Sequence, residues 1–304
     1  SSFHANFVIL MRVGTIRHPR EDKVTGIRFA AGRAAIAALA ASALIAAATL
    51  PAGAEDKADP AANALLYAVA WKQTAAEYRA LYHQGYNIAR DRVDAALAAR
   101  KDGDKPLAVF TDMDDTVLLP LPYWSRLISS GHAFFDDPIW DEWVPQNDLV
   151  IAPGAKEFFE YCQKNGVEVF YITSRDQGEN TYEYALGNLK ALGLPYADPD
   201  HLTVLTDSSN KEPRQQELAE KYTPVVWLGD NLNDFQRKYY LKGDVPGRIA
   251  AMEADREEFG RRFVLFPNPT DGHWMAAVFG ESEPADTPEA RARLLEAATT
   301  VQKP

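Results

Sequence analysis

Residues 107–116 read LAVFTDMDDT, and this stretch decides how the rest of the chain is interpreted. Its first five residues are apolar or β-branched, which is typical of a buried strand. Asp112 and Asp114 follow directly, and both can face one pocket if the chain begins to curl there. One carboxylate can then act as a nucleophile while the other handles the proton of a leaving group. The alternative is a helix N-cap or a turn, where Asp and Thr are also common.

Short apolar runs alternate with helical patterns along the chain. We predict further strands at residues 167–173, 202–205, 225–228 and 263–266. Helical patterns, the first of them one bent helix or two helices, cover residues 60–100, 155–165, 179–192 and 212–222. Buried strands with helices between them indicate an α/β fold with a doubly wound, mostly parallel sheet. Ligands bind such sheets at the carboxyl ends of the strands.

Three more polar clusters follow predicted strands, and each alone is a weak signal. Thr173 and Ser174 end a strand, where hydroxyl and backbone N–H groups suit phosphate oxygens, although many turns favour these residues. Lys211 would supply a cation beside phosphate in a chain of net charge -11, although a loop lysine is usually solvated. Asp230 and Asp234 offer hard oxygen ligands for Mg²⁺, against a capping or calcium-like loop as the alternative.

The order and the amino-acid sequences of these clusters resemble the motifs of the haloacid dehalogenase superfamily. The resemblance is closer to its class C acid phosphatases, which include lipoprotein-type 5'-nucleotidases. The resemblance extends over residues 65–279 and includes residues 71–89, 140–144, 153–175, 209–214, 227–235 and 261–274. It implies a haloacid dehalogenase-like core with a small helical cap. It also implies an Mg²⁺-dependent acid phosphatase that hydrolyses small phosphomonoesters, with 5'-nucleotides left open as substrates.

The resemblance implies a role for each cluster. Asp112 would attack phosphorus and form an aspartyl-phosphate, while Asp114 would protonate the leaving oxygen and then activate water. The phosphoryl oxygens would be held by Thr173, Ser174 and Lys211. Ser174 stands where the family often has Asn, so its contact is the least expected of the three.

The resemblance also implies the ligands of the metal ion. Mg²⁺ would be bound by the carboxylates of Asp112 and Asp230 and by the backbone carbonyl of Asp114. Asp234 would lie beside them or exchange with a ligand water.

Two residues are candidates for contact with the alcohol part of the substrate. Trp140 is an aromatic candidate, with packing in the core as the alternative. Asp271 stands where nucleotidase members often carry an aromatic residue, which weakens the expectation of strong nucleotide selectivity. Trp140 is expected to belong to the small cap, together with Trp124 and Trp143.

Two other functions remain as alternatives on the same fold. A haloacid dehalogenase does not require an acid two residues after its nucleophile, whereas this chain has Asp114. A catalytically silent storage or binding protein is disfavoured because the acidic and basic residues of all the clusters are present, namely Asp112, Asp114, Lys211 and Asp230.

The first 54 residues have the pattern of an export signal. Arg28 and Arg33 precede the uncharged, alanine-rich residues 34–50, and small residues lead to Ala54. A transmembrane anchor is one alternative, but this run is short and weakly apolar for a bilayer. A buried core helix is the other alternative. We expect export to the periplasm or the medium, cleavage near Ala54, and no stable membrane anchor.

Residues 55–105 are then expected to form N-terminal helices, residues 106–280 the phosphatase core with its cap, and residues 281–304 a charged tail.

The net charge argues against a nucleic-acid polymer as a partner. A homo-oligomer stays open. Cys162 is the only cysteine, so no intrachain disulfide can form.

Overall fold

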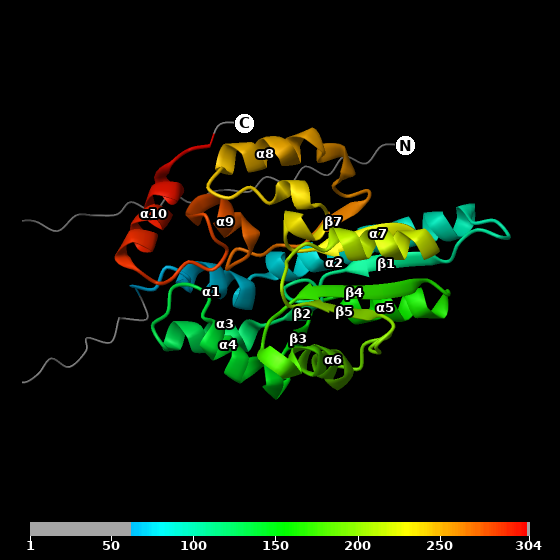
Figure 1. Ribbon diagram of the computed structural model, residues 1–304, viewed down its shortest axis with the longest axis horizontal. Coiled ribbons are helices and arrows are strands. Elements are labelled where there is room, and N and C mark those ends of the chain that lie inside the picture. Colours follow the sequence, from blue (N-terminus) through cyan, green and yellow to red (C-terminus); the bar gives the residue numbers. More distant parts are fainter. Residues whose placement is uncertain (1–61, 303–304) are drawn as a thin grey trace, which may run out of the picture. The chain divides into compact units, whose positions relative to one another are not determined.

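The central sheet has five strands that all pair in parallel. The computed structural model describes residues 62–302, and the expected export signal lies outside them. The strands follow the spatial order β5-β4-β1-β6-β7. Their bounds are Leu107–Thr111 for β1, Glu168–Ser174 for β4, Leu202–Leu205 for β5, Thr223–Gly229 for β6 and Phe263–Leu265 for β7. The predicted parallel α/β sheet is confirmed, and Figure 1 shows helices on both of its sides.

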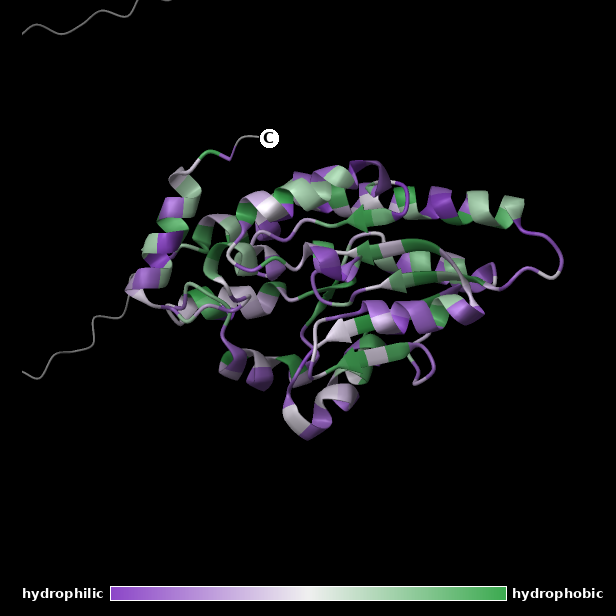
Figure 2. Cartoon of the chain, turned by 45° about the horizontal axis from the view of Figure 1, so that its top comes forward, coloured by the Kyte–Doolittle hydropathy of each residue, from purple (hydrophilic) through white to green (hydrophobic). Residues whose placement is uncertain are grey.

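Alternation along β1 explains why both faces of the sheet are covered. Leu107 and Val109 join the main core cluster, against which α2 (Ala76–Ala99), α5 (Ala155–Lys164) and α6 (Thr181–Ala191) pack. Ala108 and Phe110 point the other way and meet Leu218 of α7 (Glu212–Lys221). Figure 2 shows the strands as hydrophobic segments between helices with mixed, largely hydrophilic surfaces. A strand buried on both faces therefore reads as a continuous apolar run.

The N-terminal helical pattern forms two helices. The first, α1 (Leu66–Thr74), is separated from α2 by Ala75, whose backbone is extended with ψ 125°. Tyr82 of α2 stacks on Phe266 with ring centroids 5.0 Å apart. Gly85 lies at the same contact, and a Cβ there would fall 2.4 Å from the Phe266 ring. Glycine thus allows α2 to approach the sheet closely.

A small cap is inserted between β1 and α5, as expected. It contains the antiparallel pair β2 (Leu118–Leu119) and β3 (Val150–Ile151) and the helices α3 (Leu121–Ser129) and α4 (Asp137–Trp143). The three tryptophans assigned to the cap pack around Tyr123, with ring centroids 5.0–5.7 Å away; they are Trp124, Trp140 and Trp143. The cap thus has an aromatic core of its own.

Three C-terminal helices were not anticipated from the sequence. They are α8 (Val245–Ala254), α9 (His273–Phe279) and α10 (Pro288–Thr299). The last lies within the expected charged tail, where Ala290 packs in a cluster with Phe134 of the cap insert. No helix within residues 62–302 is long and apolar enough to cross a membrane.

Candidate active site

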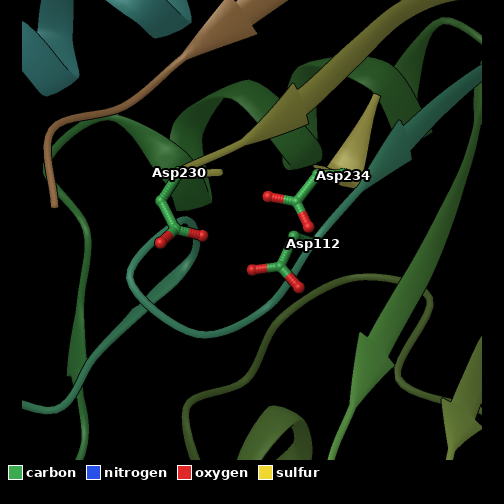
Figure 3. A group of neighbouring side chains, drawn as sticks. All are labelled: Asp112, Asp230 and Asp234. Atoms are coloured by element: carbon green, nitrogen blue, oxygen red, sulfur yellow. The ribbon is translucent and has the colours of Figure 1, made fainter. Parts of the chain in front are cut away.

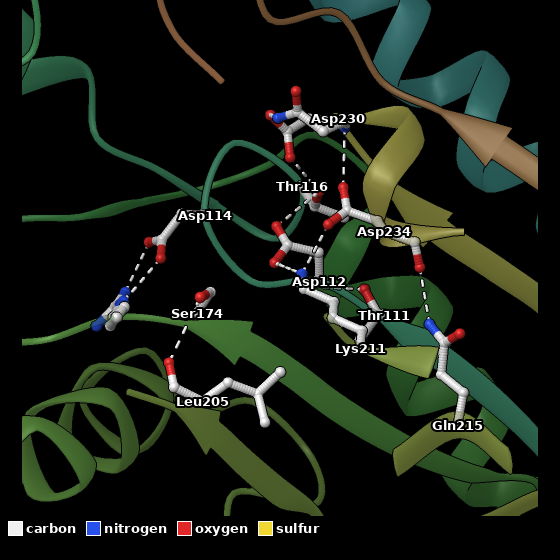
Figure 4. A network of polar contacts seen from close by, with 12 residues as sticks. Thr111, Asp112, Asp114, Thr116, Ser174, Leu205, Lys211, Gln215, Asp230 and Asp234 are labelled. Carbon is white, nitrogen blue, oxygen red and sulfur yellow. Dashed lines mark hydrogen bonds and ion pairs between the residues drawn. The ribbon is translucent and has the colours of Figure 1, made fainter. Parts of the chain in front are cut away.

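Asp112 lies at the carboxyl end of β1, at the centre of a buried polar network. Its Oδ1 accepts a hydrogen bond from Lys211 Nζ, and its Oδ2 accepts one from Thr116 Oγ1 at 3.2 Å. Lys211 precedes α7 and also donates to Asp234 Oδ1 at 2.7 Å. Figure 4 shows Lys211 between these two carboxylates. Burial acts to lower the pKa of Lys211, but Asp112 and Asp234 outweigh it and raise that pKa. The lysine is therefore held in its charged form.

Three carboxylates converge beside Lys211. Asp112, Asp230 and Asp234 offer oxygens that all lie within 4.8 Å of one another (Figure 3). Burial raises the pKa of Asp112 to about 7, opposed by Lys211 and reinforced by Asp234. Burial and Asp234 likewise raise the pKa of Asp230. The raised pKa values indicate that Lys211 alone does not neutralise three ionised carboxylates at this point.

The donor set fits a hard divalent cation. Carboxylate oxygens are the ligands that Mg²⁺ prefers, usually together with waters and substrate phosphate. Gly229 is needed at this point because a Cβ there would lie 2.5 Å from the Asp234 side chain. The sequence suggested a tight turn at this glycine, whereas the structure shows a close approach of Asp234 to the backbone.

Asp114 lies apart from this cluster, as Figure 4 shows, and faces a cavity on the cap side. Its carboxylate accepts hydrogen bonds from Arg175 Nε at 2.7 Å and Nη2 at 2.6 Å. The Asp114 side chain is 25% exposed, whereas that of Arg175 is 2% exposed. Asp115, the next residue, adopts a left-handed backbone with φ 53°, so the chain curls here. The expectation that Asp112 and Asp114 face one pocket is not met, because Asp114 lines this cavity and Asp112 does not.

The two hydroxyl residues of β4 differ in environment. Thr173 is 1% exposed, and its hydroxyl makes no hydrogen bond to any residue within 62–302. Ser174 is exposed, lines the cavity, and donates to the carbonyls of Leu205 and Ser208 at 3.4 and 3.2 Å. Both stand at the edge of the sheet where β1 also ends. Thr173 is therefore buried at the end of the strand that pairs with β1, whereas Ser174 belongs to the cavity wall.

A cavity of about 520 Å³ separates Asp114 from the cap. Trp140 and Asp271, the two predicted substrate contacts, both line it. Trp140 is nevertheless 6% exposed and packs on Trp143, so the core-packing interpretation also holds in part. Asp271 accepts a hydrogen bond from Asn268 Nδ2 at 2.7 Å.

A second, mainly apolar cavity of about 800 Å³ lies between α2, α8 and β7 and does not include Asp112 or Asp114.

Two buried cations, Arg175 and Lys72, were not among the residues predicted for the site. Arg175 follows Ser174 directly, and its two-point pairing with a carboxylate could not be read from the strand pattern. Lys72 of α1 is buried and donates to Asp115 Oδ1 at 2.6 Å and to Thr270 Oγ1 at 2.9 Å. A signal existed for Lys72, because it falls three residues after the buried Val69 and so on the apolar face of the helix. A lysine at such a position needs a partner.

Comparisons with known proteins agree with this geometry. The model of the haloacid dehalogenase superfamily, subfamily IIIB (acid phosphatase), matches residues 30–274. Two solved structures of the class C acid phosphatase from Bacillus anthracis, one with tungstate bound, are similar to this chain at 30% sequence identity and a TM-score of 0.69. Each match covers 79% of this chain and 97% of the other. The chain therefore belongs to the class C acid phosphatases, within subfamily IIIB of the haloacid dehalogenase superfamily.

Proposed function

We propose that this acid phosphatase is Mg²⁺-dependent and works through an aspartyl-phosphate on Asp112. The observation that carries the proposal is the position of Asp112. It is buried at the end of β1, hydrogen-bonded to Lys211, and shares an acidic cluster with Asp230 and Asp234. The separate carboxylate of Asp114 faces the cavity that would receive the alcohol part of a phosphomonoester.

In the first step, a carboxylate oxygen of Asp112 forms a bond to phosphorus while the bond from phosphorus to the ester oxygen breaks. Asp114 transfers its proton to that oxygen, and the alcohol leaves through the cavity. Lys211 compensates the negative charge on the phosphoryl oxygens. Thr173, and less directly Ser174, hold the same oxygens from the end of β4.

In the second step, Asp114 takes a proton from water, and the water oxygen bonds to phosphorus as the Asp112–phosphorus bond breaks. Inorganic phosphate is released, and Asp112 returns as a carboxylate. The same residue acts first as acid and then as base, so each cycle leaves its protonation unchanged.

The Mg²⁺ ion would be held by Asp112, Asp230 and the Asp114 backbone carbonyl, with Asp234 adjacent. When bound, it supplies positive charge that the three clustered carboxylates and a phosphoryl group require. The raised pKa values of Asp112 and Asp230 support this assignment, since a cation would stabilise their ionised forms.

The proposed substrates are small phosphomonoesters, with 5'-nucleotides accepted without strong preference. The Bacillus anthracis enzyme has been solved with tungstate, which is a tetrahedral oxyanion like phosphate. If this chain binds phosphate in the site that binds tungstate in that enzyme, tungstate should inhibit it competitively. Asp271 supports the weak nucleotide preference, because a carboxylate cannot stack on a base.

Hydrolysis of p-nitrophenyl phosphate tests the proposal. The rate should be lost in EDTA and restored by added Mg²⁺, and calorimetry should detect Mg²⁺ binding that Asp230→Asn weakens. Trapping with labelled substrate should place the phosphoryl group on Asp112. EDTA-insensitive turnover would contradict the metal dependence, and dehalogenation of a haloacid without phosphatase activity would favour the dehalogenase alternative.

We also propose that the chain is exported and cleaved near Ala54. The support is the alanine-rich pattern of residues 34–50 and the small residues that follow it. Mass spectrometry of the native protein should find a chain that begins near Glu55. A native chain that retains residues 34–50 would contradict cleavage.

A further inference from the structure

The cavity beside Asp114 carries far more negative than positive charge. Its wall includes one cation, Arg175, and six carboxylates, contributed by Asp114, Asp115, Asp137, Asp176, Asp271 and Glu283. They come from the loop after β1, the cap, the end of β4 and the C-terminal region. Such convergence from separate parts of the chain is unlike an ordinary solvated surface.

Two of these carboxylates already have a cation. Arg175 pairs with Asp114, and the buried Lys72 pairs with Asp115. The remaining four form no ion pair with any lysine or arginine within residues 62–302; they are Asp137, Asp176, Asp271 and Glu283. The cavity therefore holds four carboxyl groups that have no paired lysine or arginine among the described residues.

The energetics of three of these groups agree with a missing cation. Desolvation, together with Asp137 and Asp271, raises the pKa of Glu283 to about 7. Desolvation also raises the pKa of Asp137 and of Asp271. A positive charge placed among these carboxylates would stabilise their ionised forms.

Aromatic side chains complete the wall. Trp124, Phe135 and Trp140 line the cavity beside the carboxylates. Two of these rings already face a cation, because Lys72 Nζ lies 5.4 Å from the Trp124 ring centroid and Arg175 Cζ lies 5.6 Å from that of Trp140. Aromatic rings attract ammonium groups, and combinations of rings and carboxylates are how proteins recognise quaternary ammonium ions. The Nε1 of Trp124 is in addition a buried donor that has no partner within residues 62–302.

The position of the cavity beside Asp114 indicates which part of the substrate it receives. The proposed mechanism places the phosphoryl group at Asp112 and Lys211, and Asp114 must reach the ester oxygen. The alcohol part of the substrate then extends past Asp114 into the acidic cavity. The phosphate is thus bound where the protein supplies a positive charge, and the alcohol part is bound where the protein supplies carboxylates.

We infer that the preferred substrates are phosphomonoesters whose alcohol carries a positive charge, such as phosphates of amino or quaternary ammonium alcohols. This inference rests on the proposed phosphatase function. Asp137, Asp271 and Glu283 would compensate the ammonium charge, and the rings of Trp124 and Trp140 would contact its methyl or methylene groups.

A matched pair of substrates tests the inference. Phosphocholine and 3,3-dimethylbutyl phosphate have nearly the same shape, but the first carries a quaternary nitrogen where the second has a neutral carbon. Wild-type kcat/KM should favour phosphocholine on the order of tenfold, the size expected for a partly desolvated cation beside rings and carboxylates. The double variant Asp137→Asn with Glu283→Gln should bring the ratio of the two values toward one. Asp148→Asn changes an exposed cap carboxylate outside the cavity and should keep the ratio.

Inhibition provides a measurement that needs no variant. Choline should inhibit hydrolysis of p-nitrophenyl phosphate by the wild type more strongly than 3,3-dimethylbutanol. Equal kcat/KM for the two esters, equal inhibition by the two alcohols, or a preference that survives in a folded double variant would overturn the inference. Absence of p-nitrophenyl phosphate hydrolysis in the wild type would instead contradict the proposed function itself.

Discussion

Arg175 holds the carboxylate of Asp114 through two hydrogen bonds, from Nε to Oδ2 at 2.7 Å and from Nη2 to Oδ1 at 2.6 Å. The third nitrogen of the guanidinium donates to Asn188 Oδ1 at 2.7 Å. Asn188 in turn donates to the carbonyl of Val144 and to Asn147 in the cap insert, at 3.0 and 2.8 Å. The orientation of the proposed acid–base is thereby connected to the cap. A two-point pair of this kind restricts the rotation of a carboxylate.

Arg175→Lys should impair hydrolysis in a way that depends on the leaving group. Lysine keeps the charge but loses the two-point geometry, so Asp114 can rotate away from the ester oxygen. An alkyl phosphate such as glycerol 2-phosphate, which needs its leaving oxygen protonated, should lose on the order of tenfold to a hundredfold in kcat. p-Nitrophenyl phosphate should lose much less, because p-nitrophenolate leaves without a proton. An equal loss for both substrates would show that Arg175 does not act through the acid role of Asp114.

Asp112→Asn should abolish turnover, because an amide cannot form the aspartyl-phosphate. Asp114→Asn should lose on the order of a hundredfold or more, since it removes the proposed acid and base. Steady-state assays with glycerol 2-phosphate, whose leaving oxygen needs a proton, measure both effects, with circular dichroism to verify folding. Retained turnover in a folded Asp112→Asn protein would refute the covalent mechanism.

Asp271→Tyr should raise the preference for AMP over p-nitrophenyl phosphate. One stacking contact between a base and an aromatic side chain contributes on the order of 1–3 kcal/mol, and Asp271 lines the cavity proposed to receive the alcohol part of the substrate. The measurement is the ratio of kcat/KM for the two substrates in the wild type and the variant. A wild type that already favours AMP strongly, or a ratio that the substitution leaves unchanged, would show that Asp271 does not limit nucleotide binding.

Lys72→Met should destabilise the fold although it leaves the acidic cluster at Asp112 intact. The Lys72 and Asp115 side chains are 0% and 4% exposed, so the variant leaves a carboxylate buried without its cation. Such a loss costs about 3–5 kcal/mol in free energy of unfolding. Urea denaturation measures it, and the double variant Lys72→Met with Asp115→Asn should recover part of the loss. A Lys72→Met protein as stable as the wild type would contradict the pairing.

His201 should make stability depend on pH near neutrality. Its ring nitrogens lie 2.7 Å from Asp198 Oδ1 and 2.8 Å from Glu168 Oε2. Burial acts to lower the pKa of His201, but the two carboxylates outweigh it and raise that pKa in the folded state. The stabilisation is therefore fully present below the unfolded-state pKa of about 6.5 and is lost as pH rises through the raised folded-state value.

The measurement is the free energy of unfolding of wild type and His201→Gln between pH 6 and pH 9. The advantage of the wild type should be largest at the acidic end of that range and should shrink toward the alkaline end. The pKa of Asp198 is lowered in the fold, so its own contribution is lost only as pH falls through that lowered value, outside this range. An advantage that is constant with pH would contradict the role of the His201 charge.

The sequence by itself determined the five strands of the sheet, the helices α5, α6 and α7 between them, and the carboxylates at the strand ends. These features depend on local patterns, because a strand buried on both faces must be apolar throughout and parallel strands expose their ends at one edge. Asp112, Lys211, Asp230 and Asp234 could therefore be assigned to one site before any contact was known.

Only the tertiary structure decided which charges meet. Arg175 and Asp114 are 61 residues apart, and Lys72 and Asp115 are 43 residues apart, so neither pair leaves a local pattern. The helices α8, α9 and α10 also escaped prediction, because their apolar residues find partners only in the folded chain. The acidic cavity likewise exists only where the cap, β4 and the C-terminal region converge. Charge pairing acts through space, and separation along the chain carries no information about it.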